Sequence, residues 1–184
     1  MTSLQSVPAP FIRDSRPEDL PAIAAIYGHW VRTALASFEY VPPDVAEMAT
    51  RRAAVLAAGY PYLVAEDGCG RVIGYAYASA YRTRPAYRFA VENSVYVDAA
   101  TTGGGIGRAL MAALIERTTA AGFRLMVAVI GDTANHASIG LHRAMGFRSA
   151  GVLPSIGWKH GRWVDSVLMT RPLGDADTSV PGED

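Results

Sequence analysis

Residues 92–110 constrain this chain more than any other stretch, because they predict a strand, a glycine turn and the start of a helix in direct succession. The segment Val95-Tyr96-Val97 consists of residues that favour a pleated sheet. Glycines follow at positions 103, 104, 105 and 107 and permit backbone conformations that other residues rarely adopt. From Arg108 the apolar residues recur at helical spacing. A glycine turn that opens a helix points free amide groups at one place, which predicts an anion site, most often for phosphate.

Two familiar phosphate motifs do not match this turn. A P-loop ends in Gly-Lys-Ser/Thr, whereas Arg108 and Ala109 follow Gly107 here. A dinucleotide-binding turn needs a further glycine where this chain has Leu110, and Asp132 comes too late to be its ribose-binding acid. The motif alone therefore leaves two interpretations open: another kind of phosphate site, or a tight turn that is merely rich in glycine.

The length and composition predict one domain without nucleic-acid or membrane partners. The chain has 184 residues, half of them hydrophobic, and a formal net charge of zero. A nucleic-acid-binding protein would show a basic excess, and no apolar run reaches the about 18 residues of a membrane span. We expect a disordered tail over residues 1–10, a domain over 11–173 and a disordered acidic tail over 174–184. The first ten residues do not resemble a secretory signal, so we expect a cytoplasmic protein.

The single cysteine predicts neither a disulfide nor a metal site. Cys69 lies in a turn between two apolar runs, and no other ligand has metal-binding spacing around it. A nucleophilic role would require a neighbouring base that the sequence does not reveal. We therefore expect no metal cofactor.

The periodicity of apolar residues predicts strands alternating with helices. We expect a helix from Leu20 that ends before Ala34, and further helices over 45–58, from Arg108 to about residue 121, and over 137–145. The predicted strands cover 11–13, 62–66, 72–80, the stretch before the glycine turn, 125–130, 149–157 and 163–171.

Five stretches together resemble one enzyme family, the GNAT acetyltransferases, and within it the phosphinothricin and methionine sulfoximine acetyltransferase branch. They are residues 91–97, 103–108, 127–130, 138–147 and 157–165, in the order that the family shows. One position departs from the pattern: the family usually has Gln or Arg at the start of the glycine motif, where this chain has Thr102. The resemblance implies a mixed, mostly antiparallel sheet with helices on both faces, in an α/β (α+β) fold.

The same resemblance implies acetyl-CoA as the cosubstrate. Its pantetheine arm would pair with the strand backbone at Val95, Tyr96 and Val97. Its pyrophosphate would bind the turn formed by Gly103, Gly104, Gly105, Ile106, Gly107 and Arg108. Asn135 would approach the pantetheine from the other side, although an ordinary helix N-cap is an equally good interpretation.

Two residues are candidates for proton transfer. Direct acetyl transfer needs a free amine, and Glu92 begins the strand that would hold the cosubstrate, so it is the candidate base. A solvated or salt-bridged acid at the end of a strand is the alternative. His142 lies where many family members place a tyrosine that protonates the departing thiolate, but a structural histidine is also compatible with this position.

The branch implies a small amino acid or an analogue as the acceptor amine. Its wall would be formed by Phe38, Arg82, Arg84, Tyr87 and Arg88. An arginine there could bind the acceptor's acid group through two parallel hydrogen bonds. We rank Arg88 first and Arg84 second, and the alternative is that these arginines are simply solvated.

Other functions and the assembly remain to be tested. A protein N-terminus or a polyamine could be the acceptor, and a module that binds acyl-CoA without turnover is the rival class. The family tends to form dimers through its last strands, so Trp158, Trp163 and Val164 predict a homodimer.

Overall fold

The computed structural model describes residues 9–181 and shows seven strands and four α-helices in this range. The strands are β1 (Phe11–Asp14), β2 (Tyr62–Glu66), β3 (Val72–Ala80), β4 (Ala90–Val97), β5 (Leu125–Gly131), β6 (Arg148–Lys159) and β7 (Arg162–Pro172). The helices are α1 (Leu20–Thr33), α2 (Val45–Ala57), α3 (Ile106–Ala120) and α4 (His136–Ala144). Each element predicted from periodicity is present, with ends that differ by a few residues.

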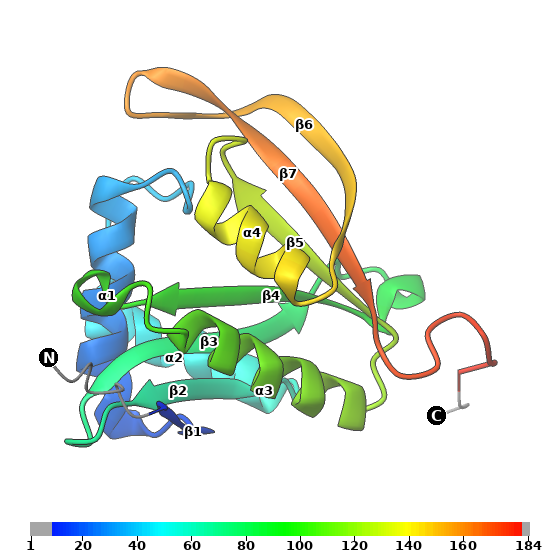
Figure 1. Ribbon diagram of the computed structural model, residues 1–184, viewed down its shortest axis with the longest axis horizontal. Helices are drawn as coiled ribbons and strands as arrows, with labels where there is room; N and C mark the ends of the chain where they lie inside the picture. The colour runs from blue at the N-terminus through cyan, green and yellow to red at the C-terminus, as the bar shows by residue number, and fades with distance from the viewer. Residues whose placement is uncertain (1–8, 182–184) are drawn as a thin grey trace, which may run out of the picture.

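All the strands belong to one sheet in the order β1-β2-β3-β4-β5-β7-β6. Every neighbouring pair is antiparallel except β4 and β5, which are parallel. This parallel pair is short and runs only from Ala90 opposite Leu125 to Glu92 opposite Val127. Beyond Glu92 the two strands diverge, as Figure 1 shows. The expected mixed, mostly antiparallel sheet is confirmed.

Helices cover both faces of the sheet, and each face has its own apolar core (Figure 1). On one face, α3 buries Leu110, Met111 and Leu114 completely. On the other, α1 buries Ile23 and Val31 in a cluster that also contains tyrosines from β2 and β3. Full burial of each large apolar side chain stabilises the fold by about 1.5–3 kcal/mol. The two cores fix the positions of the central strands, including β4 and β5.

The predicted domain bounds and the two disordered tails stay predictions. Residues 1–8 and 182–184 lie outside the described part of the chain. Residues 174–177 form turns after β7. The Arg124 guanidinium lies 3.5 Å from the Asp175 carboxylate and donates to the Ser179 hydroxyl at 3.0 Å. These contacts connect the start of the second tail to the domain.

Candidate active site

The divergence of β4 and β5 opens a cleft with a volume of about 1210 Å³. Its walls come from the end of α1 and the segment that follows it, from β4, from the glycine turn, and from β5 and α4. The cleft brings together most of the site residues predicted from the sequence: Phe38, Glu92, Val95, Tyr96, Val97, Gly103, Gly105, Ile106, Gly107, Arg108, Asn135 and His142. Gly104 belongs to the same turn but does not line the cleft.

The backbone of β4 presents alternate residues to this cleft. The Asp98 amide donates to the carbonyl of Ile73 at 2.9 Å. The backbone amides and carbonyls of the even-numbered residues of β4 therefore pair with β3 in the antiparallel ladder. The carbonyl of Asn93 and the backbone groups of Val95 and Val97 therefore point into the gap toward β5, whereas the Asn93 amide belongs to the last rung of the β4–β5 ladder, Glu92 opposite Val127. Tyr96 was expected to pair with a ligand through its backbone, but that backbone is directed at β3.

One carbonyl in this row already has a partner. The indole Nε1 of Trp30, near the end of α1, donates to the Val97 carbonyl at 2.7 Å. Asn93 and Val95 precede this position in the row, and their backbone groups extend it deeper into the cleft. The row thus offers peptide groups of the kind that an extended amide-containing ligand can bind by strand-like pairing.

The glycine turn has the geometry of an anion site. Gly103 and Gly105 have φ angles of 86° and 78°, values that favour glycine. Gly105 is the N-cap of α3, and the amides of Ile106, Gly107 and Arg108 have no acceptor within the helix. A Cβ on Gly107 would lie 3.3 Å from Leu141 Cδ2, so a larger side chain would crowd the wall between α3 and α4. These amides and the helix dipole favour a negatively charged group.

Glu92 lies half-buried in the wall of the cleft. Burial raises the pKa of its carboxyl from the ordinary value of 4.5, and the positive charge of Arg82 opposes part of this shift. A carboxylate with a raised pKa is a stronger proton acceptor than an exposed one. Its position in β4 places it on the face of the sheet that carries Tyr77, whose pKa is raised in part by the charge on Glu92.

His142 is buried on the opposite face of β4 and both of its ring nitrogens are engaged. Its Nδ1 lies 2.8 Å from the Ser138 carbonyl, which can only accept, so Nδ1 carries the proton. Its Nε2 lies 2.9 Å from Asn93 Nδ2 and accepts from that amide. Burial lowers the pKa of His142. The ring is thus held neutral, with its one proton directed at the helix backbone.

Asn93 completes this arrangement and has one unsatisfied atom. Its Oδ1 is buried and has no hydrogen-bond partner among the described residues. Buried polar oxygens normally have a donor, and Asn93 lines the cleft. A ligand that reaches this point between β4 and α4 could supply the missing donor.

The arginine loop lies differently from the prediction. Arg82, Arg84, Tyr87 and Arg88 are exposed and do not line the cleft. Arg88, the first choice from the sequence, stacks over the Phe89 ring at 4.5 Å and borders a second pocket with Tyr60 and Arg124. The chain turns at the start of β4, so closeness to Glu92 in the sequence does not bring Arg88 to the cleft wall in this structure, and its role in substrate binding stays a prediction. Arg82 is the arginine whose charge reaches Glu92.

Comparison with known proteins assigns this architecture to a family. Residues 12–168 match the family model described as an acetyltransferase (GNAT) domain. The chain belongs to the GNAT acetyltransferases.

Three GNAT relatives are similar over nearly the whole chain. The phosphinothricin N-acetyltransferase of Alcaligenes faecalis is 55% identical over 92% of this chain and 86% of its own length. An L-methionine sulfoximine/L-methionine sulfone acetyltransferase of Pseudomonas paraeruginosa is 44% identical over 92% of this chain and 98% of its own. The solved phosphinothricin acetyltransferase of Sinorhizobium meliloti, in complex with acetyl-CoA, superposes with a TM-score of 0.93 at 48% identity, covering 96% and 95% of the two chains.

Asn135 has the second of its two predicted roles in this GNAT fold. Its side chain accepts from the Ser138 amide at 3.2 Å and caps α4. It also lines the cleft, so contact with a cosubstrate remains compatible with the cap.

Trp30 and Asn93 line the GNAT cleft and Lys159 lies outside it, and none of the three was identified from the sequence. Trp30 was only one residue of the helix predicted from Leu20. Asn93 lies within residues 91–97, a stretch that was noted for its family resemblance and not for this side chain. Lys159 lies in a family-like stretch, and its being the only lysine of the chain was a signal that could have been used. Within residues 9–181, no group of three or more His, Cys, Asp or Glu could hold a metal ion, and no helix is long and apolar enough to cross a membrane.

Proposed function

We propose that this protein transfers the acetyl group of acetyl-CoA to the α-amine of a small amino acid or analogue, of the phosphinothricin, methionine sulfoximine or methionine sulfone type. The observation that carries the proposal is a single cleft that holds both a glycine turn with the geometry of an anion site and a half-buried carboxylate with a raised pKa. The activities named for the similar chains support this substrate class.

The residues present fit acetyl-CoA in two places. The free amides at the start of α3 suit its pyrophosphate. The Asn93 carbonyl and the backbone groups of Val95 suit the amides of its pantetheine arm. When bound, the cosubstrate supplies an activated acetyl thioester.

Glu92 is the proposed general base. An ammonium has no lone pair, so the amine must lose a proton to Glu92, directly or through water, before its nitrogen attacks the thioester carbonyl. The new C–N bond forms as the C–S bond breaks, and the thiolate departs with the electron pair. Burial helps because it raises the proton affinity of the carboxylate.

His142 fits a positioning role better than the acid role expected from the sequence. A neutral ring whose proton is donated to the Ser138 carbonyl has none to give to a thiolate. The ring also fixes the Asn93 amide on the cleft side of β4. We therefore propose that His142 holds Asn93 in place, and that the proton for the thiolate comes from solvent or from the amine.

The acceptor's acid group is proposed to lie near Arg82. The charge of this arginine acts on Glu92 and lowers its pKa. A free amino acid carries its acid group near its amine, so an amine at Glu92 would place the acid group near Arg82. Phe38 lines the same cleft and supplies apolar surface for a side chain. Arg82, like Arg84, Tyr87 and Arg88, does not line the cleft, so direct contact with the acceptor would require the loop to move inward.

We also propose a homodimer and a cytoplasmic location. The β6–β7 hairpin exposes Ile156, Trp158 and Trp163 at 56%, 49% and 61% of their surfaces. Val164, which the sequence analysis also assigned to the interface, is buried and does not belong to this exposed surface. Large exposed aromatics are typical of interfaces. The cytoplasm is the compartment in which acetyl-CoA and free amino acids meet.

The deciding experiment measures thiol release from acetyl-CoA over a panel of amines. The panel contains phosphinothricin, methionine sulfoximine, methionine sulfone, their methyl esters, a polyamine and a peptide with a free N-terminus. Turnover of the free amino acids alone supports the proposal. Equal turnover of esters or polyamines would refute the substrate class, and CoA binding without any turnover would favour the acyl-CoA-binding module.

A further inference from the structure

Lys159 is the only lysine in this chain, and it is almost completely buried. It ends β6 and is 2% exposed. Its Nζ donates to the carbonyl of Ser37 at 2.6 Å. An ammonium group is expensive to remove from water unless its surroundings compensate for the lost solvation. A chain that otherwise uses arginine for its basic residues thus keeps one lysine at a costly position.

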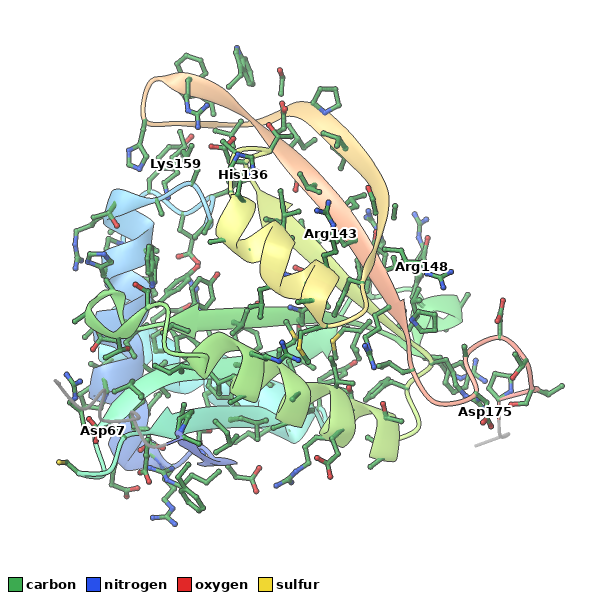
Figure 2. All side chains as sticks on the ribbon, viewed as in Figure 1. Asp67, His136, Arg143, Arg148, Lys159 and Asp175 are labelled. Atoms are coloured by element: carbon green, nitrogen blue, oxygen red, sulfur yellow. The ribbon has the colours of Figure 1, made fainter. Side chains whose placement is uncertain are left out.

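Lys159 is one of three consecutive residues that hold the same segment, residues 37–40. A Cβ on Gly157 would lie 2.6 Å from Phe38 Cε2, so only glycine leaves room for this ring. The carbonyl of Trp158 accepts from the Tyr40 hydroxyl. Side chains alternate along a strand, so Gly157 and Lys159 share the face that meets the segment. In Figure 2, Lys159 lies where the β6–β7 hairpin meets the chain after α1.

The helices hold this segment from its other side. The Tyr27 hydroxyl from α1 lies 2.9 Å from Ser37 Oγ and donates to Glu39 Oε1 at 2.7 Å. Arg51 from α2 donates to the same carboxylate oxygen at 2.6 Å. The charge of Lys159 also acts on Glu39 and helps to lower the pKa of that carboxyl. Residues 37–40 are therefore held between two helices and the hairpin.

The segment matters because its members form one wall of the cleft. Ser37, Phe38 and Glu39 line the cavity that also contains Glu92. Lys159 itself does not line it. The anion-binding turn and the β4 backbone, which we assign to acetyl-CoA, belong to other walls. A change in how residues 37–40 are held should therefore affect the acceptor and not the cosubstrate.

We propose that Lys159 is a positioning residue for the acceptor: by holding the Ser37 carbonyl it fixes the Phe38 wall against which the amino acid's side chain is selected. This inference rests on the proposed function. It makes the β6–β7 hairpin, which supplies no group to the chemistry, a determinant of substrate choice.

The first test replaces Lys159 by methionine, which keeps most of the volume and removes the amine. The Ser37 carbonyl is then buried without a donor, and the segment should loosen. We expect the KM for the amino-acid acceptor to rise about 10- to 100-fold, with the affinity for CoA measured by calorimetry changed less than about twofold. Arg148→Met is the matched control, because it removes a cation from the exposed far end of the same strand.

Two results would overturn the proposal. One is an unchanged acceptor KM in folded Lys159→Met. The other is an equal loss of acceptor and CoA binding, which would indicate a general structural defect. The contacts of Gly157, Trp158 and Lys159 with residues 37–40 form what we call the clamp. If Lys159→Met does not fold, Tyr40→Phe tests the clamp from the surface, because Tyr40 is 68% exposed and loses only its hydrogen bond to the Trp158 carbonyl. It should raise the acceptor KM in the same direction, and an unchanged value would then refute the clamp.

A second measurement separates the clamp from the proposed substrate. A sample labelled with ¹⁵N-lysine has a single Nζ signal, since the chain has one lysine. We expect slow solvent exchange at this amine, and in Lys159→Met or Tyr40→Phe at least about tenfold faster exchange of the Glu39 amide, which donates to Ser37 Oγ, with unchanged amide exchange at Leu110, Met111 and Leu114 in the buried face of α3. Rapid Nζ exchange, or equal amide exchange, would refute the clamp. Failure of the wild type to acetylate any amino acid would refute the substrate class, while these exchange rates would still judge the clamp.

Discussion

Replacing Glu92 by glutamine should separate the contribution of this carboxylate to the reaction rate from its effect on the stability of the fold. The amide is nearly isosteric but cannot take a proton from the acceptor's ammonium. Loss of a general base typically lowers the rate by about 10²–10⁴-fold. We expect kcat to fall in this range while the affinity for CoA stays unchanged, because the groups assigned to CoA are the backbone of β4 and the glycine turn and not the Glu92 side chain. Thiol release at saturating acetyl-CoA measures the first quantity and calorimetry the second.

The same substitution should stabilise the protein at neutral and alkaline pH. Burial raises the pKa of Glu92 above 4.5, so the folded state binds this proton more tightly than the unfolded state. Below about pH 4.5 both states are protonated and the effect vanishes; as the pH rises through the folded pKa, the wild type loses stability that the variant keeps. Each unit of pKa shift corresponds to about 1.36 kcal/mol.

Thermal unfolding at pH 4 and pH 8 measures this second effect. The melting temperature of Glu92→Gln should exceed that of the wild type at pH 8 and approach it at pH 4. Glu116→Gln, the same change at an exposed position of α3, is the control and should alter neither quantity. Wild-type turnover in Glu92→Gln across pH 6–9 would refute the base, and equal stability at pH 8 would refute the argument from burial.

Three further predictions test other parts of the site. Arg82→Ala should raise the pKa of Glu92, because the charge of this arginine lowers it, and should move the rising limb of the pH profile of kcat/KM to higher pH. Arg88→Ala should leave that limb in place. A shift in Arg88→Ala and none in Arg82→Ala would favour the ranking made from the sequence. Gly107→Val should abolish most CoA affinity in calorimetry while circular dichroism shows a folded protein, and undiminished affinity would remove the anion-site argument. Trp163→Glu should convert a dimer into a monomer in sedimentation, and a wild type that is already monomeric at micromolar concentration would exclude the proposed homodimer.

Local features of this protein were readable from the sequence because they depend on neighbouring residues. Apolar periodicity located the helices and strands, since burial of one helix face or of alternate strand residues needs no knowledge of partners. The glycines at 103, 105 and 107 indicated the anion turn, because the positive φ angles of Gly103 and Gly105 and the close approach of Leu141 to Gly107 favour that residue type. Glu92 could be named as the candidate base because it lies in the strand that leads into this turn, and its role stays a prediction.

Only the tertiary structure decided which distant residues meet. The β3–β4 ladder shows that the Asn93 carbonyl and the backbone groups of Val95 face the cleft, whereas those of Tyr96 face β3. No local sequence pattern distinguishes these two directions. The neutral state of His142 depends on a strand residue 49 positions away, and Lys159 reaches a carbonyl 122 positions earlier. Arg88 looked nearest to Glu92 along the chain, yet the turn before β4 directs it to another pocket. Hydrogen bonds and charges act over a few ångströms in space, so their partners are set by the packing of the sheet and helices rather than by separation in the chain.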